Sequence, residues 1–118
     1  RHAADVVIFA TGFDTQHPPY AGLGRGDGGE TLADHWRDGM RSAGSVMVPG
    51  FPDLYVLNGP NATLGHNSSI LVIEAQVDFA VRHIAGRSGP VEPLPAAEAA
   101  FDDEVARRSA GTPWVAEG

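Results

Sequence analysis

The stretch that decides the fold runs from residue 58 to residue 70 and reads Asn58-Gly59-Pro60-Asn61-Ala62-Thr63-Leu64-Gly65-His66-Asn67-Ser68-Ser69-Ile70. Glycine, proline and asparagine are typical of tight turns, and serine is typical of a helix N-cap. The residues therefore predict a turn that leads from a strand into a helix. The N–H groups at a helix N-terminus carry partial positive charge, which suits a phosphate or a carbonyl that gains negative charge. The stretch indicates either a ligand site or an ordinary strand-to-helix turn with a polar rim.

The strongest helix signal follows this turn, from Ser68 to about residue 85, with Ser68 as the N-cap. Apolar residues recur there at helical spacing, which predicts one face turned toward a core. They are Ile70, Ile73, Val77, Val81 and Ile84. Asp78 and Arg82 lie four residues apart on the wetter face, where an ion pair stabilises a helix slightly. Gly86 is expected to end the helix.

Apolar runs upstream of the turn predict strands. Residues 5–10 are continuously apolar and rich in β-branched side chains, which is typical of a strand covered on both faces. Residues 45–48 and 54–58 form shorter apolar runs bounded by proline, glycine and asparagine. We expect the strands at residues 5–10 and 54–58 to lie in one sheet, with the long helix covering one face.

The remaining segments predict loops and shorter helices. Residues 14–30 are rich in glycine and proline and are expected to form an exposed loop. Thr31 is a candidate N-cap for a short helix over residues 32–40. A second, weaker helix is expected over residues 96–108, and residues 112–115 form a terminal strand or a docking arm.

Composition limits the class of protein. A chain of 118 residues has room for one domain. Its net charge, 8 − 15 = −7, argues against nucleic acid or an anionic membrane as a partner. The absence of cysteine excludes disulfides, thiolate zinc sites and a cysteine nucleophile, and no apolar run is long enough to span a membrane. The chain begins at Arg1, directly before a strand-like run, so we expect a cytoplasmic piece of a longer protein.

Three apparent catalytic signals carry little weight. Residues 24–29 match G-x-G-x-x-G, but no hydrophobic strand precedes them, as a dinucleotide-binding turn requires. The five histidines are not spaced as metal ligands, so no metal site is expected. Ser68 lies near His66, yet the chain has no G-x-S-x-G motif, and Ser68 is better explained as a helix cap.

Several blocks of sequence, taken in order, resemble those of one family. They are Asp5-Val6-Val7-Ile8-Phe9-Ala10-Thr11-Gly12-Phe13, Pro49-Gly50-Phe51-Pro52-Asp53-Leu54-Tyr55, Gly59-Pro60-Asn61, Leu64-Gly65-His66-Asn67-Ser68, Glu74-Ala75-Gln76 and Thr112-Pro113-Trp114. Their order and spacing resemble the class B flavoprotein monooxygenases, which include the flavin-containing and the Baeyer–Villiger monooxygenases. The resemblance is good over residues 3–86 and looser beyond them.

The resemblance implies an α/β fold: part of the Rossmann-like FAD-binding domain of a two-dinucleotide-binding-domain flavoprotein, with few strands, one long helix and one shorter helix. This chain would be the C-terminal portion of that domain. Residues 1–13 would be a strand and an interdomain crossover, 14–30 a loop, 31–86 a strand-turn-helix core and 87–118 a C-terminal tail. The whole enzyme would use FAD, NADPH and O₂ to add one oxygen atom to a ketone, sulfur or nitrogen.

The resemblance also assigns residues. The implied cofactor-binding residues are Thr11, Gly12, Phe13, Gly59, Pro60, Asn61, Leu64, Gly65, His66, Asn67 and Ser68. No catalytic residue is assigned, because the family's nucleotide fingerprints and catalytic arginine would lie upstream. We therefore expect the isolated chain to be inactive, to bind FAD weakly or not at all, and to retain neither FAD nor NADPH.

Partners and alternatives follow from the same reasoning. The chain would contact the upstream FAD-domain and NADPH-domain residues of the whole protein. As an isolated piece it is expected to form a homo-oligomer through uncovered apolar faces. Two alternatives stay open: a piece of another two-domain flavin oxidoreductase, or a small free-standing α/β module that binds an anion at Ser68.

Overall fold

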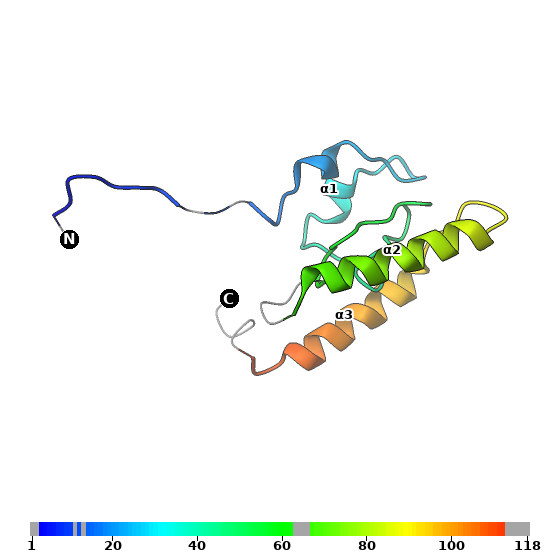
Figure 1. Cartoon of the computed structure of the whole chain (residues 1–118). Coiled ribbons are helices and arrows are strands. Elements are labelled where there is room, and N and C mark those ends of the chain that lie inside the picture. The colour runs from blue at the N-terminus through cyan, green and yellow to red at the C-terminus, as the bar shows by residue number, and fades with distance from the viewer. Residues whose placement is uncertain (1–2, 11, 13, 63–66, 113–118) are drawn as a thin grey trace.

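The computed structural model describes residues 3–10, 12, 14–62 and 67–112. These residues form a 3-10 helix, η1 (Pro19–Gly22), and three α-helices: α1 (Leu32–His35), α2 (Ser69–Gly86) and α3 (Pro95–Ser109). Figure 1 shows the two long helices below the η1–α1 region and an N-terminal segment that extends away from the rest of the molecule. None of the described helices is long and apolar enough to cross a membrane.

The core lies between η1, α1 and the irregular chain that follows them. We call it the Trp36 core; its buried members are Ala21, Leu32, Trp36, Val48, Phe51 and Val56. Trp36 is only 5% exposed. Its indole Nε1 donates a hydrogen bond to the Arg41 carbonyl at 2.7 Å, and the ring of Tyr20 meets it edge-on. The predicted exposed loop over residues 14–30 is therefore wrong in part, because η1 buries Ala21 in this core.

Helix α1 begins with a capping box. The Thr31 hydroxyl accepts a hydrogen bond from the Asp34 N–H at 3.1 Å, and the Asp34 carboxylate accepts one from the Thr31 N–H at 3.3 Å. The predicted Thr31 cap is confirmed, although the helix ends at His35 rather than near residue 40. Hydrogen bonds from Thr31, and then the Arg37 guanidinium, hold the pKa of Asp34 below its usual value.

The predicted sheet is wrong for the part of the chain that the structure describes, which contains no strand. Residues 5–10 are extended and exposed, with Ile8 and Phe9 both 85% exposed. The two shorter runs meet only at an isolated bridge between Met47 and Tyr55, next to a 2.8 Å hydrogen bond from Val56 N–H to the Val46 carbonyl. A strand is stable only beside other strands that pair with its backbone. The described residues supply no such neighbours.

Helix α2 confirms the predicted helix but not its predicted inner face. The Ser68 hydroxyl caps it by accepting from the Leu71 N–H at 3.4 Å, and the last helical residue is Gly86. Four of the five residues expected to face inward are exposed, and Ile73 is half-buried; the exposed ones are Ile70, Val77, Val81 and Ile84. The buried residues are Gln76 and Ala80. The helix is apolar on more than one side, so contacts of Gln76 with the preceding chain decide which side packs.

The glycine-rich turn at residues 24–29 confirms the loop interpretation. The Gly26 N–H donates to the Glu30 carbonyl at 2.9 Å, and the backbones of Arg25 and Thr31 form an isolated antiparallel β-bridge. No strand leads into this turn, and the helix after it begins beyond Thr31. A side chain on Gly26 would collide with the Gly50 carbonyl, so the glycine serves internal packing.

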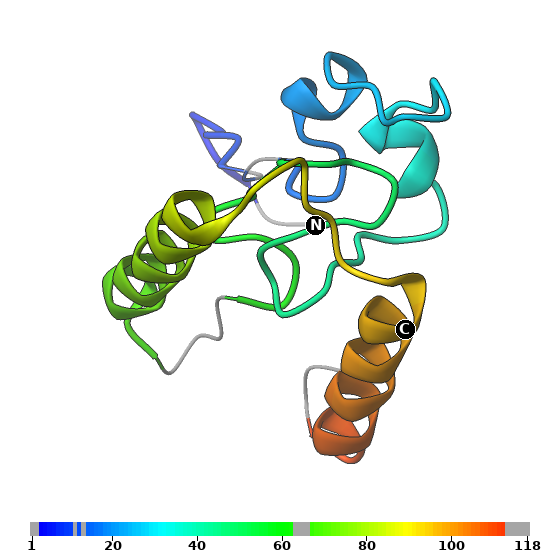
Figure 2. The ribbon, with the colours of Figure 1, turned by 90° about the vertical axis from the view of Figure 1, so that its right-hand side faces the viewer.

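Helix α3 confirms the second predicted helix and begins with Pro95 in its first turn. It does not pack directly on α2: Figure 2 shows the two helices on opposite sides of the irregular chain between them. Its attachments are to the core region. Within α3, Glu98 Oε1 lies 3.3 Å from His35 Nε2, and in the segment just before the helix Glu92 Oε2 accepts from the Gly50 N–H at 2.6 Å. Most of the predicted terminal segment, residues 113–115, lies outside the described residues.

Candidate functional site

The candidate site is built on a tight turn at residues 58–62. Asn58 and Asn61 have left-handed backbone angles, with φ of 54° and 64°. Asparagine tolerates this conformation better than most residues. The Ala62 N–H closes the turn by donating to the Gly59 carbonyl at 3.0 Å. A Cβ on Gly59 would lie 2.5 Å from the Ser45 carbonyl oxygen, so only glycine lets the turn approach that backbone.

The N-terminus of α2 forms the second part of the site. Asn67 and Ser68 are exposed there. The first turn of α2 holds no acidic side chain, whereas the first turns of α1 and α3 hold Asp34 and Glu98. A carboxylate in the first turn would offset the positive end of the helix dipole. The described part of this site therefore presents neutral donors and a positive helix end, which suits a neutral or anionic polar ligand.

The structure brings together some of the implied cofactor-binding residues. Gly59, Pro60 and Asn61 form the turn, and Asn67 and Ser68 begin α2. Gly12 has a φ of 79°, and no atom lies within 4 Å of where its Cβ would be. Five implied residues lie outside the described residues: Thr11, Phe13, Leu64, Gly65 and His66.

Gln76 connects the two parts of the site, and sequence reasoning had not assigned it a role. Its Oε1 accepts from the Asn58 N–H at 2.7 Å, and its Nε2 donates to the Ser45 carbonyl at 2.9 Å. One signal could have revealed it: a single amide among the apolar residues Val72, Ile73 and Ala80, which lie three or four positions from it on the helix. A buried amide needs partners, so its position already indicates a contact with backbone or with another polar group.

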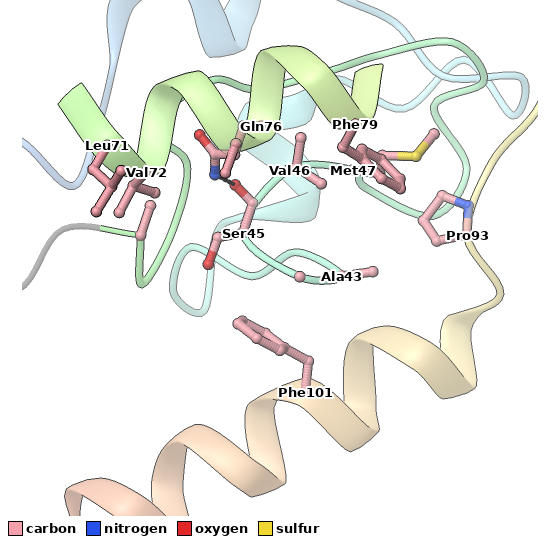
Figure 3. Close-up of a pocket in the computed structure, with 13 residues that line it drawn as sticks. Ala43, Ser45, Val46, Met47, Leu71, Val72, Gln76, Phe79, Pro93 and Phe101 are labelled. Atoms are coloured by element: carbon pink, nitrogen blue, oxygen red, sulfur yellow. Dashed lines mark hydrogen bonds between the residues drawn. The ribbon is translucent and has the colours of Figure 1, made fainter. Parts of the chain in front are cut away.

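An open, mostly apolar groove of about 680 Å³ lies beside this connection, between α2 and α3 (Figure 3). Leu71, Val72 and Phe79 line it from α2, and Phe101 points toward it from α3. Its polar side chains are Ser45 and Gln76. Within the residues that the structure describes, no cluster of three or more histidine, aspartate or glutamate side chains could hold a metal ion. The groove supplies apolar surface rather than acid–base or metal chemistry.

Comparison with known proteins gives a consistent result. No family model matches the chain. It is 33% identical to a Baeyer–Villiger monooxygenase of Streptomyces coelicolor, over 98% of this chain and 23% of that protein. It is 42% identical to a FAD-binding monooxygenase of Aspergillus niger, over 61% of this chain and 12% of that protein.

A solved structure agrees with these relatives. An open crystal structure of cyclohexanone monooxygenase superposes with a TM-score of 0.61 and 32% identity, over 70% of this chain and 17% of that one. The chain thus spans less than a quarter of the length of the proteins it matches. By sequence and by structure, the chain is similar to one part of flavin-dependent monooxygenases that include Baeyer–Villiger monooxygenases and a cyclohexanone monooxygenase.

Proposed function

We propose that this chain supplies the turn and helix that hold one edge of the flavin in a longer FAD- and NADPH-dependent monooxygenase. One observation carries the proposal: 33% identity to a Baeyer–Villiger monooxygenase over 98% of the chain. The share of that relative covered, 23%, supports the further proposal that the nucleotide fingerprints and the catalytic groups belong to other parts of such an enzyme.

Two features of the described residues support this proposal. The turn at residues 59–62 and the start of α2 offer neutral polar groups, and the first turn of α2 carries no carboxylate that would repel a developing anion. Bound FAD, reduced by NADPH, would supply the chemistry that activates O₂. The role of this chain would be to place the positive end of α2 near the pyrimidine edge, which favours the reduced flavin because that edge gains negative charge on reduction.

The substrate class of the whole enzyme is a ketone, a sulfur compound or a nitrogen compound. Two of the similar proteins are named Baeyer–Villiger monooxygenase and cyclohexanone monooxygenase, and these names favour a ketone as the substrate. The side chains that would select the substrate and bind NADPH are proposed to lie outside this chain, in parts of the relatives that it does not match.

Purification of the chain alone gives a first test, and we expect a colourless protein with no flavin absorbance. An exposed helix N-terminus contributes only about 0.3–1 kcal/mol toward a nearby negative charge, whereas even millimolar affinity requires about 4 kcal/mol. The glycine-rich fingerprint that would hold the pyrophosphate is expected elsewhere in the enzyme. Stoichiometric FAD on this chain alone would contradict the division of roles proposed here.

The complete reading frame gives the decisive test. It should encode two G-x-G-x-x-G motifs that follow strands, and its product should be yellow and should consume NADPH in the presence of a ketone. Ser68→Ala should weaken FAD binding, because it removes the cap at the end of α2 that faces the flavin. Ser88→Ala, at an exposed position beyond α2, is the matched control and should have no effect. A complete protein that is folded but binds no FAD would overturn the proposal.

We also infer that the chain by itself forms homo-oligomers. Apolar side chains of the N-terminal segment and of α2 are exposed, and contiguous exposed apolar surface usually finds a partner. In the complete enzyme the same surfaces would contact the remaining parts of the FAD and NADPH domains.

A further inference from the structure

We propose that Gln76 is a positioning residue that fixes the turn at residues 58–62 relative to the N-terminus of α2, and thereby sets the position of the flavin edge. The inference that this turn faces a flavin rests on the proposed function above. The mechanical part, a side chain that joins the turn to the helix, does not depend on it.

Gln76 bonds to main chain on both sides of its amide. Figure 3 shows its side chain reaching from α2 toward the Ser45 backbone. Its Nε2 donates to the Ser45 carbonyl at 2.9 Å, and its Oε1 accepts from the Asn58 N–H at 2.7 Å. Both distances are within the range of well-formed hydrogen bonds. One side chain on α2 therefore fixes two backbone segments that are distant from it in sequence.

Burial limits what could replace these two hydrogen bonds. Gln76 is only 7% exposed, among the apolar side chains that line the groove. Water has little access to the Gln76 amide or to Ser45, which is also buried, so removal of the amide would leave the Ser45 carbonyl without a replacement partner. It would also open the part-buried Asn58 N–H to solvent. Unsatisfied buried polar groups are costly, and the backbone would have to move to recover hydrogen bonds.

The two segments that Gln76 holds also constrain each other. Ser45, at φ of 63°, follows Gly44, at φ of 62°, in a tight turn, and Asn58 is also left-handed. The Ser45 carbonyl that accepts from Gln76 is the atom that a Cβ on Gly59 would meet at 2.5 Å. The position of Gly59 therefore depends on the Ser45 backbone, and the Ser45 backbone is held by Gln76.

The geometry gives Gln76 a specific effect on the site. Asn58 begins the turn that contains Gly59, Pro60 and Asn61, and Gln76 lies on the helix that Ser68 caps. The amide thus links the start of the turn directly to α2, the helix whose N-terminus is the other described end of the proposed flavin-facing segment. A rigid link of this kind would keep the turn and the positive helix end at one distance from a bound flavin.

Amide hydrogen exchange on the full chain, without flavin, tests the link itself. The main variant is Gln76→Met, which keeps the length and apolar packing of the side chain but removes both hydrogen bonds. We expect the Asn58 amide to exchange about tenfold faster or more, equivalent to about 1.4 kcal/mol. Gln76→Glu keeps an oxygen that can accept from the Asn58 N–H but loses the donor to the Ser45 carbonyl and buries a charge, so it should not restore full protection. Arg82→Met, at an exposed position of the same helix, is the matched control and should leave Asn58 unchanged.

The flavin-loaded complete enzyme tests the positioning role. Gln76→Met should weaken FAD binding about tenfold and lower the midpoint potential of the bound flavin, because the positive helix end no longer lies at its set distance from the reduced edge. Arg82→Met should change neither value. If Gln76 were only a packing residue, its loss would lower the unfolding temperature and leave the midpoint potential of the remaining bound flavin unchanged.

The two experiments separate the possible failures. Unchanged exchange at Asn58 in Gln76→Met would overturn the link, whatever the flavin does. Faster exchange with an unchanged potential would overturn the positioning role while leaving the proposed function intact. Faster exchange in the chain, together with a complete wild-type protein that binds no FAD, would overturn the positioning role because the proposed function itself had failed. Faster exchange together with a lower potential supports the proposal.

Discussion

Apolar side chains are buried in one region of the molecule and exposed in another. In the Trp36 core, the apolar residues from η1, α1 and the following chain are buried against one another, and the Trp36 indole has a backbone partner. The second region, which we call the open surface, leaves its large apolar residues exposed. It comprises Val6, Val7, Ile8, Phe9, Ile70, Leu71, Val77, Phe79, Val81 and Ile84.

The difference shows which contacts this chain can complete alone. The Trp36 core draws only on residues 21–56 of this chain, so its neighbours are always present. The open surface belongs to an extended segment and to those apolar side chains of a long helix that stay largely exposed within the described chain. Burial of apolar area is the main favourable term in folding, so we expect the open surface to contribute to stability only after another chain or domain covers it.

The largest expected effect compares an aromatic residue from each region. Trp36→Ala should lower the free energy of unfolding by about 3–5 kcal/mol, enough to abolish cooperative unfolding in a small domain. Phe9→Ala should change it by less than about 0.5 kcal/mol, because Phe9 is 85% exposed. Urea denaturation followed by circular dichroism measures both. A loss above about 1 kcal/mol for Phe9→Ala would show that the N-terminal segment packs onto the body.

A smaller effect is expected at Gly59, where the turn approaches the Ser45 backbone. Gly59→Ala should destabilise the chain by about 1–3 kcal/mol, because its Cβ would press on the Ser45 carbonyl, which Gln76 holds. Gly28→Ala is the control: no atom lies within 4 Å of its Cβ position, so it should be neutral within about 0.5 kcal/mol. The same denaturation experiment applies, and equal effects at both glycines would contradict the packing argument.

The open surface itself can be altered without touching the core. The double variant Ile70→Gln and Val81→Gln should shift the isolated chain toward monomer in sedimentation experiments over a range of concentrations. Its free energy of unfolding at low concentration should change by less than about 0.5 kcal/mol, since both side chains are exposed. A wild-type chain that is monomeric at every concentration would contradict the proposed self-association.

The smallest expected effect is a pH dependence of α1. The pKa of Asp34 is held below its usual value of 3.8, chiefly by hydrogen bonds from Thr31. Its contribution to stability is therefore complete above that value and is lost as the pH falls through the lowered folded-state pKa. Asp34→Asn should be slightly less stable than the wild type at neutral pH and equal to it in strong acid. Exchange of the Thr31 amide, whose N–H the carboxylate accepts, measures the difference.

Part of the candidate site could be predicted from the sequence. The turn residues Gly59, Pro60 and Asn61 and the Ser68 cap follow from local chemistry, and the structure confirms the turn and the cap. The contact of Gln76 with Asn58 and Ser45 could not be derived in the same way. It joins residues 18 and 31 positions apart, and a helical pattern shows which residues share a side without showing which backbone that side will meet.

The sequence by itself determined the local elements: Thr31 and Ser68 as caps, the extent of α2 to Gly86, and the glycine-rich turn at residues 24–29. Each depends on hydrogen bonds and backbone preferences within a few residues, so each follows from the order of the side chains alone. Only the tertiary structure decided that Gln76 and Ala80 face inward and that residues 5–10 lie exposed. Burial depends on which other surfaces are present, and the residues that would pair with a strand or cover a helix are not specified by that strand or helix.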